Sequence, residues 1–129
     1  MASVLVVDDK LIMRRKIKGE LRKLGLTISG EAKNGKMALV KCQENEPDLI
    51  MLDILMPGMD GIETLKKIRK EFPDVKVVMV TSLSKKDKVL KAIKSGADHY
   101  IVKPIKEQNI RGAVTETLGE NVINESSTG

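Results

Sequence analysis

The stretch "LIMLDILMPGMDG" (residues 49–61) runs four apolar residues directly into Asp53 and then turns through Pro57, Gly58 and Gly61. A short continuous apolar run that ends in turn residues is typical of a strand buried on both faces, as in a parallel sheet. A carboxylate at the end of such a strand needs a chemical explanation, because burial disfavours its charged form.

Short β-rich runs and longer amphipathic stretches alternate along the whole chain. Strands are expected at 3–7, 26–29, 48–53, 76–82 and 99–103, and helices near 10–24, 35–45, 61–70, 84–95 and 106–118. Gly96 follows the fourth helix, where a helix end favours a residue that tolerates positive φ. Five strand–helix units in one short chain predict a doubly wound (βα)5 α/β sandwich.

The composition indicates one globular domain with an aliphatic core. Of the 129 residues, 41% are apolar and only 2% are aromatic. We expect the domain to occupy residues 1–118 and the polar tail 119–129 to be loosely ordered. No apolar run approaches the roughly 20 residues of a membrane span, and the N-terminus leaves no room for a signal peptide, so a cytoplasmic protein is expected. Cys42 is the only cysteine, which excludes an internal disulfide, and we expect it to face the core.

Polar side chains stand at the carboxyl ends of four expected strands. They are Asp8, Asp9, Asp53, Thr81, Ser82 and Lys103. In an open α/β sheet the ligand site lies at this edge, where the strand order reverses. If the order is 2-1-3-4-5, the flavodoxin-like arrangement, then Asp8, Asp9 and Asp53 converge. Three close carboxylates repel one another unless a cation lies between them, and Mg²⁺ is the ion that best fits oxygen ligands of this kind.

Four motifs carry a family resemblance. "VLVVDD", "PDLIMLDILMPGMDG", "VVMVTS" and "SGADHYIVKP", in this order and spacing, resemble a response-regulator receiver domain, and the stand-alone chemotaxis type most closely. The resemblance covers residues 3–118 and implies the 2-1-3-4-5 strand order. It further implies a phosphorylation-activated switch of two-component signalling, which catalyses only its own phosphoryl transfer and dephosphorylation and is otherwise not an enzyme.

The resemblance assigns roles to individual residues. Asp53 would accept the phosphoryl group. Asp8, Asp9 and Asp53 itself, with the Leu55 carbonyl, would hold Mg²⁺, for which Mn²⁺ can substitute. Thr81 and Lys103 would bind phosphoryl oxygens, and Tyr100 would be the rotameric switch. The apolar Leu55 and Leu83 flank the phosphoryl position and predict slow hydrolysis, because neither can orient the attacking water. The Lys103–Pro104 peptide is expected to be cis, as in the family.

Other interpretations compete with these roles. Asp9 and Asp60 could each cap a helix, Thr81 could be an ordinary strand residue, and Tyr100 could serve packing alone. "GEAKNGKM" (30–37) resembles a P-loop but has Met37 where a Mg²⁺-binding hydroxyl is required. A dehalogenase-type phosphatase needs a second Asp where Leu55 stands. An unswitched α/β adaptor or a nucleic-acid-binding module also remains an alternative.

The chain is basic, with 23 Lys and Arg against 18 Asp and Glu. The first expected helix carries Lys10, Arg14, Arg15, Lys16, Lys18, Arg22 and Lys23, and the fourth carries Lys85, Lys86, Lys88, Lys91 and Lys94. A basic surface without stacking aromatics favours protein docking over nucleic acid. By resemblance, the first helix docks a histidine kinase or phosphotransfer protein, and the fourth helix, fifth strand and fifth helix bind the downstream protein. We expect no intrinsic DNA-binding domain, and a monomer for which dimerisation on phosphorylation stays open.

Overall fold

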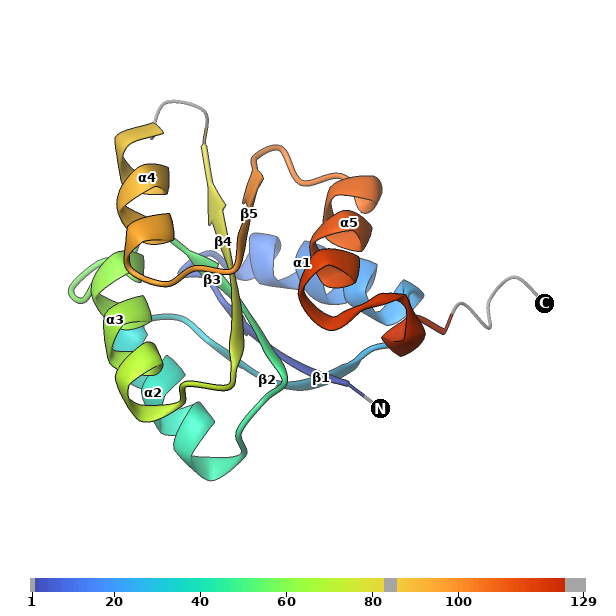
Figure 1. Ribbon diagram of the computed structural model, residues 1–129, viewed down its shortest axis with the longest axis horizontal. Coiled ribbons are helices and arrows are strands. Elements are labelled where there is room, and N and C mark those ends of the chain that lie inside the picture. The colour runs from blue at the N-terminus through green and yellow to red at the C-terminus, as the bar shows by residue number, and fades with distance from the viewer. Residues whose placement is uncertain (1, 83–85, 125–129) are drawn as a thin grey trace.

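A central parallel sheet with helices on both faces forms the molecule (Figure 1). The computed structural model describes residues 2–82 and 86–124. The elements are β1 (Ser3–Val7), α1 (Leu11–Lys23), β2 (Thr27–Ala32), α2 (Gly35–Glu44), β3 (Leu49–Asp53), α3 (Gly61–Glu71), β4 (Lys76–Thr81), α4 (Lys86–Lys94), β5 (His99–Val102), α5 (Glu107–Leu118) and the 3-10 turn η2 (Glu120–Val122). The strand order is β2-β1-β3-β4-β5, which confirms the predicted flavodoxin-like sandwich.

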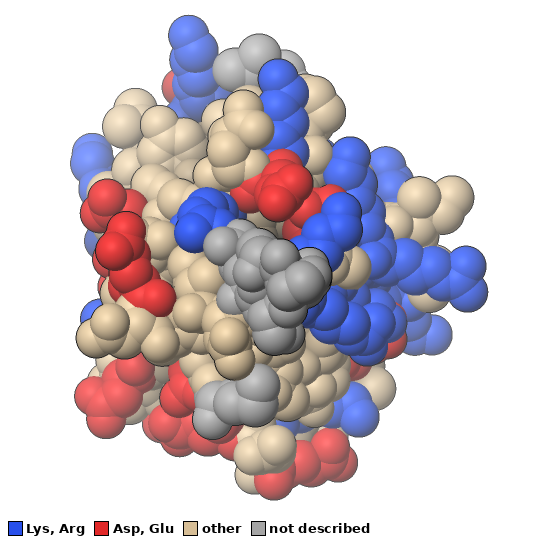
Figure 2. All heavy atoms as spheres, turned by 90° about the vertical axis from the view of Figure 1, so that its right-hand side faces the viewer, with Lys and Arg blue, Asp and Glu red and all other residues tan. Residues whose placement is uncertain are grey.

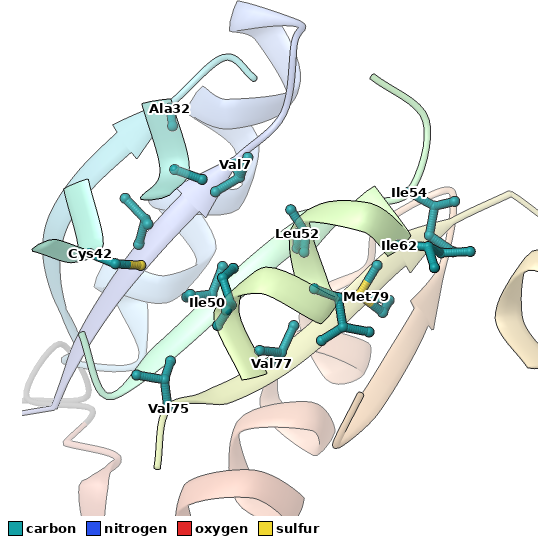
Figure 3. Packing of buried hydrophobic residues seen from close by; sticks show 14 of the residues in the cluster. Val7, Ala32, Cys42, Ile50, Leu52, Ile54, Ile62, Val75, Val77 and Met79 are labelled. Carbon is teal, nitrogen blue, oxygen red and sulfur yellow. The ribbon is translucent and has the colours of Figure 1, made fainter. Parts of the chain in front are cut away.

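Two hydrophobic clusters, one on each face of the sheet, form the core. Alternate residues of each inner strand point to opposite faces, so Ile50 and Leu52 pack under α2 and α3, whereas Leu49 and Met51 pack under α1 and α5. Figure 3 shows Leu52, Ile54 and Met79 in the first of these clusters. The inner strands are continuous apolar runs because both of their faces are covered.

Strand β2 is longer and more polar than the sequence indicated. It extends from Thr27 to Ala32, beyond the expected end at residue 29, and the register shifts where it pairs with Val4 and Leu5 of β1. β2 pairs with β1 alone and is an edge strand, so its polar residues can reach solvent or neighbouring side chains. The apolar pattern that marks a buried strand is therefore missing from Ser29, Gly30 and Glu31.

The chain after α5 is more ordered than expected. Val122 and Ile123 pack against the core cluster beneath α1 and α5, and the Asn124 N–H donates to the Leu24 carbonyl at 2.8 Å. The expectation of a loosely ordered tail is thus wrong for residues 119–124, because two apolar side chains anchor them. Residues 125–129 lie outside the described part of the chain.

Several local predictions are confirmed. Asp60 caps α3, since its side chain accepts the Glu63 N–H at 2.9 Å. Gly96 has φ 107°, Cys42 is buried, and the Lys103–Pro104 peptide is cis. The P-loop alternative fails on geometry, because residues 30–32 belong to β2 and do not form a phosphate-binding loop.

Arg69 of α3 fastens two loops together at the amino-terminal edge of the sheet. Its guanidinium donates to the carbonyls of Gly96 and Val75 at 2.8 and 2.7 Å and to the Asp98 carboxylate at 2.5 Å. Asp98 also accepts the N–H of Val77, the second residue of β4, at 2.8 Å. One side chain thereby joins α3, β4 and the loop between α4 and β5.

We therefore expect Arg69→Met to lower the free energy of unfolding by about 2 kcal/mol, because two partly buried carbonyls and the Asp98 carboxylate lose their donor at once. Urea denaturation measures the change. Lys70→Met, an exposed neighbour on the same helix, is the matched control and should stay close to wild type. Equal stabilities of the two variants would contradict the role given to Arg69.

Candidate functional site

The register of the sheet brings the predicted polar residues to one edge. Val7 pairs with Leu52, so the residues that follow them, Asp8 and Asp53, lie side by side at the carboxyl ends of β1 and β3. Thr81 ends β4 next to Asp53, because Asp53 pairs with Val80. Thr81 in turn pairs with Val102 of β5, which places Lys103 at the same edge. The predicted convergence of these residues is confirmed.

The three aspartates form a compact acidic cluster. Asp8, Asp9 and Asp53 each offer a carboxylate oxygen, and these oxygens lie within 4.8 Å of one another. Asp8 is 0% and Asp53 4% exposed, whereas Asp9 lies nearer to solvent. Asp9 does not cap α1, whose N-cap residue is Lys10 and has no side-chain cap hydrogen bond among the described residues. The capping interpretation of Asp9 is therefore wrong.

Lys103 is the cation that faces the cluster. Its Nζ lies 3.6 Å from Asp53 Oδ1 and 3.9 Å from Asp8 Oδ2. Both distances exceed those of a short charge-assisted hydrogen bond, so the ammonium compensates the carboxylates only in part. Within the described chain, Asp8 Oδ2 is a buried oxygen that has no hydrogen-bond partner.

Burial dominates the electrostatics of the two inner carboxyls. It raises the pKa of Asp53 to about 6, with the nearby Asp8 charge adding to the rise and Lys103 opposing it. Burial also raises the pKa of Asp8, against the lowering effects of the Lys10 N–H and Lys103. Two carboxyls that resist ionisation at one place indicate a site that lacks positive charge.

A divalent cation fits this donor set. The oxygens of Asp8, Asp9 and Asp53 are hard ligands, and the unpartnered Asp8 Oδ2 is an acceptor that a cation would satisfy. The arrangement is typical of the Mg²⁺ site of receiver domains. Thiol or imidazole ligands are absent from the cluster, which disfavours a zinc site.

A hollow of about 380 Å³ opens above the cluster and is lined by Asp9, Lys10, Asp53, Leu55, Thr81, Ser82 and Lys103. Leu55 is 46% exposed at its rim, and its N–H donates to Asp53 Oδ1 at 3.4 Å. Close backbone contact shapes the loop, because a side chain at Gly61 would collide with the Asp53 carbonyl. Thr81 is 3% exposed, and its hydroxyl donates to the Ser82 carbonyl at 3.3 Å. Leu83 lies outside the described residues.

Tyr100 stands apart from the acidic cluster. It is 40% exposed on β5 and lines a groove with Ser82, Lys86, Val89, Leu90, Ile93 and Val102. The groove therefore connects the end of β4 to the outer side of α4 and β5. The ring of Tyr100 lies 6.0 Å from the ring of His99, centroid to centroid.

The basic surface of α1 is smaller than the sequence suggested. Glu31 of β2 accepts from Arg14 Nε at 2.7 Å and from Lys18 Nζ at 2.5 Å, so these two charges are paired. Arg15, Lys16 and Arg22 remain exposed, and Lys23 is exposed but its Nζ lies 3.3 Å from Glu20 Oε1. Figure 2 shows Lys and Arg gathered on the right of the face that it presents, and Asp and Glu mainly on the left and lower parts. The Glu31 contacts could not be predicted from the sequence, although the four-residue spacing of Arg14 and Lys18 indicates that both lie on one helix face.

Comparison with known proteins gives the family. The model of the response regulator receiver domain matches residues 4–115. The chain is 39% identical over 115 residues to chemotaxis protein CheY of Bacillus subtilis, which covers 89% of this chain and 96% of that protein. It is also 38% identical over 124 residues to response regulator protein VraR of Staphylococcus saprophyticus, covering 95% of this chain and 59% of that protein.

A solved structure supports the same relationship. The CheX–CheY–BeF3–Mg²⁺ complex of Borrelia burgdorferi contains a chain with a TM-score of 0.86 and 29% identity, over 91% of this chain and 89% of that one. The fold and the acidic edge thus define a signalling module, not a conventional enzyme. This chain belongs to the response regulator receiver domains of two-component signal transduction. Within its described residues, no helix is long and apolar enough to cross a bilayer.

The raised pKa of Asp53 predicts a pH dependence of stability in metal-free protein. A carboxyl whose folded pKa of about 6 exceeds its ordinary value of 3.8 binds more protons when folded, so stability falls as pH rises from about 4 to about 6. Asp53→Asn removes this loss, so its free energy of unfolding should exceed that of wild type by about 3 kcal/mol at pH 7, and by much less at pH 4.

Urea denaturation in EDTA at several pH values measures both proteins. Asp74→Asn, which replaces an exposed aspartate, is the matched control and should follow the wild-type curve. A constant difference between wild type and Asp53→Asn from pH 4 to 7 would argue against the raised pKa.

Proposed function

We propose that this receiver is a phosphorylation-activated switch that takes a phosphoryl group from a histidine kinase or phosphotransfer protein on Asp53. The observation that carries the proposal is the position of Asp53, which lies beside two further carboxylates, with Lys103 Nζ 3.6 Å away, beneath an open hollow. A phosphoryl donor can reach this carboxylate from solvent.

The transfer follows from the chemistry of these groups. A carboxylate oxygen of Asp53 attacks phosphorus, an O–P bond forms, and the N–P bond of phosphohistidine breaks, with its electron pair returning to the imidazole. Lys103 and Thr81 would donate hydrogen bonds to phosphoryl oxygens. Asp8 and Asp9, with the Leu55 carbonyl, would hold Mg²⁺, or Mn²⁺ in its place. When bound, the ion offsets the negative charge of the carboxylates and of the phosphoryl group.

Thr81 and Tyr100 form the proposed switch. The 3.3 Å hydrogen bond of Thr81 is long, so its hydroxyl can turn toward a phosphoryl oxygen at little cost. That movement frees space between β4 and α4, which Tyr100, half-exposed on the neighbouring strand, can occupy. The face formed by α4, β5 and α5 would then present a changed surface to its partner.

The proposal also covers the binding partners of the protein, its place in the cell and the residues that make up the receiver unit. The exposed basic residues of α1 suit docking of the phosphodonor, and the CheY relatives support a chemotaxis protein as the target of the α4–β5–α5 face. We place the protein in the cytoplasm as a monomer, with dimerisation upon phosphorylation as a further possibility. The receiver unit would extend over residues 1–118.

Acetyl phosphate with Mg²⁺ tests the function directly. Intact mass should show one phosphoryl adduct on wild type and none on Asp53→Asn, because that variant lacks the nucleophile. Asp9→Ala should give no adduct above the level seen in EDTA, and its melting temperature should not rise with Mg²⁺ as that of wild type does.

Asp87→Ala, an exposed aspartate on α4, is the control for loss of one acidic residue and should be phosphorylated normally. A wild-type protein without any adduct would support the alternative of an unswitched α/β adaptor. An Asp9→Ala protein that accepts the group at the wild-type rate would refute the assigned metal site.

The aspartyl phosphate should be long-lived. Leu55 at the rim of the hollow cannot orient a water molecule, and Leu83 is apolar as well, so in-line attack on phosphorus is disfavoured. The double variant Leu55→Asn, Leu83→Glu should lose phosphate about tenfold faster, since positioned polar groups contribute at this scale or above. Single-turnover decay of radiolabelled protein measures the rate, and a double variant as slow as wild type would disprove the explanation.

A further inference from the structure

The polar atoms of Asp8 are held in a way that leaves one oxygen for the acidic site. Its N–H donates to the Ala32 carbonyl at 3.1 Å, and its Oδ1 accepts the Lys10 N–H at 2.9 Å. Its main-chain carbonyl accepts from Arg14 Nη1 at 2.7 Å. Oδ2 is left buried and without a hydrogen-bond partner among the described residues, at the place where the carboxylates meet. The orientation of this oxygen therefore depends on the three other contacts.

Arg14 supplies the one contact of these three that comes from a side chain. The other two join main-chain N–H groups to neighbouring acceptors and follow from the strand pairing and the turn. Arg14 is itself held, because its Nε donates to Glu31 Oε1 at 2.7 Å and Lys18 binds the other oxygen of the same carboxylate. These two cations lower the pKa of Glu31, which keeps it ionised. The guanidinium thus spans β1 and β2 with its planar fork fixed at both ends.

The start of α1 shows why the contact between Arg14 and the Asp8 carbonyl matters. Lys10, the N-cap residue, makes no side-chain cap hydrogen bond among the described residues, and its main-chain N–H joins the preceding turn to the helix start by donating to Asp8 Oδ1. Arg14, one turn into α1, reaches back to the Asp8 carbonyl and adds a contact from within the helix. Its loss would remove the side-chain donor that holds the turn carrying Asp8 and Asp9.

We propose that Arg14 is a positioning residue of the acidic site, held by Glu31, which orients the Asp8–Asp9 turn for a divalent cation. The inference rests on the proposed function, since it concerns the ion that Asp8 and Asp9 would hold. Mg²⁺ demands nearly ideal octahedral ligand geometry, so small displacements of its ligands weaken binding. Loss of residues that orient metal ligands typically lowers affinity 10–100-fold.

The sign of the effect separates positioning from simple charge. Arg14→Gln removes a positive charge from the neighbourhood of the cluster, and by Coulomb's law alone this should strengthen the binding of a cation. Positioning predicts the opposite, a rise of about tenfold in the dissociation constant for Mg²⁺. Arg14→Lys keeps the charge but has no fork to join the Asp8 carbonyl to Glu31, so it should also bind Mg²⁺ more weakly.

The experiment is an NMR titration of the metal-free proteins with Mg²⁺, which yields the dissociation constant and the amide shift of Lys10, whose N–H reports on Asp8 Oδ1. Melting temperatures in EDTA record stability separately. Arg15→Gln removes the same charge from an exposed position one residue away and is the matched control, expected to bind Mg²⁺ as wild type does. Weaker binding by both Arg14 variants, with a moved Lys10 amide, supports the proposal.

Other outcomes overturn it. If Arg14→Gln lowers the melting temperature but binds Mg²⁺ as tightly as wild type, Arg14 is structural only. If Arg14→Gln and Arg15→Gln change affinity alike, the effect is one of overall charge. If Arg14→Gln does not fold, Arg14→Lys decides by the same criterion. A wild-type protein that binds no Mg²⁺ refutes the proposed function together with this inference, whereas normal binding by wild type and both Arg14 variants refutes only the inference.

Discussion

The burial of two neighbouring carboxylates is the constraint on which the site depends. Parallel pairing of β1 with β3 places Asp8 and Asp53 side by side at the end of buried strands, where charge is poorly solvated. Both pKa values rise in consequence. Lys103 Nζ lies 3.6 Å from Asp53 Oδ1 and 3.9 Å from Asp8 Oδ2 and offsets only part of their negative charge. An added cation would therefore stabilise the two carboxylates further.

The amino-terminal edge of the sheet carries contacts that stabilise the fold, whereas the carboxyl edge carries the residues of the site. At the amino-terminal edge, Arg69 donates hydrogen bonds to the Asp98 carboxylate and to the Gly96 carbonyl, and Asp98 also accepts the Val77 N–H. At the carboxyl edge, Asp8 Oδ2 has no hydrogen-bond partner among the described residues, and the Thr81 hydroxyl makes a long hydrogen bond of 3.3 Å. Because the contacts of Arg69 and Asp98 hold the amino-terminal edge of the sheet, the carboxyl edge can carry unsatisfied polar groups, and binding and switching require such groups.

An element could be predicted from the sequence where its own residues show a strong hydrophobic pattern. The inner strands and the residues at their ends could be predicted, because burial on both faces demands continuous apolar runs. Strand β2 was predicted too short, since an edge strand tolerates the polar Ser29 and Glu31. The order of residues 119–124 was missed because it depends on contacts with distant parts of the chain, namely the packing of Val122 and Ile123 and the hydrogen bond from Asn124 to Leu24.

The succession of strands and helices, and the residues at the strand ends, follow from the amino-acid sequence, because hydrophobic periodicity and turn residues are local. The acidic and basic groups of the site are visible there too. How those groups are partnered depends on the folded arrangement. Arg14 reads as one of many surface charges in the sequence, yet in the fold it joins the Asp8 carbonyl to Glu31. Such contacts depend on the register between strands and on the approach of α1 to β2, and both arise from packing between residues distant in the sequence.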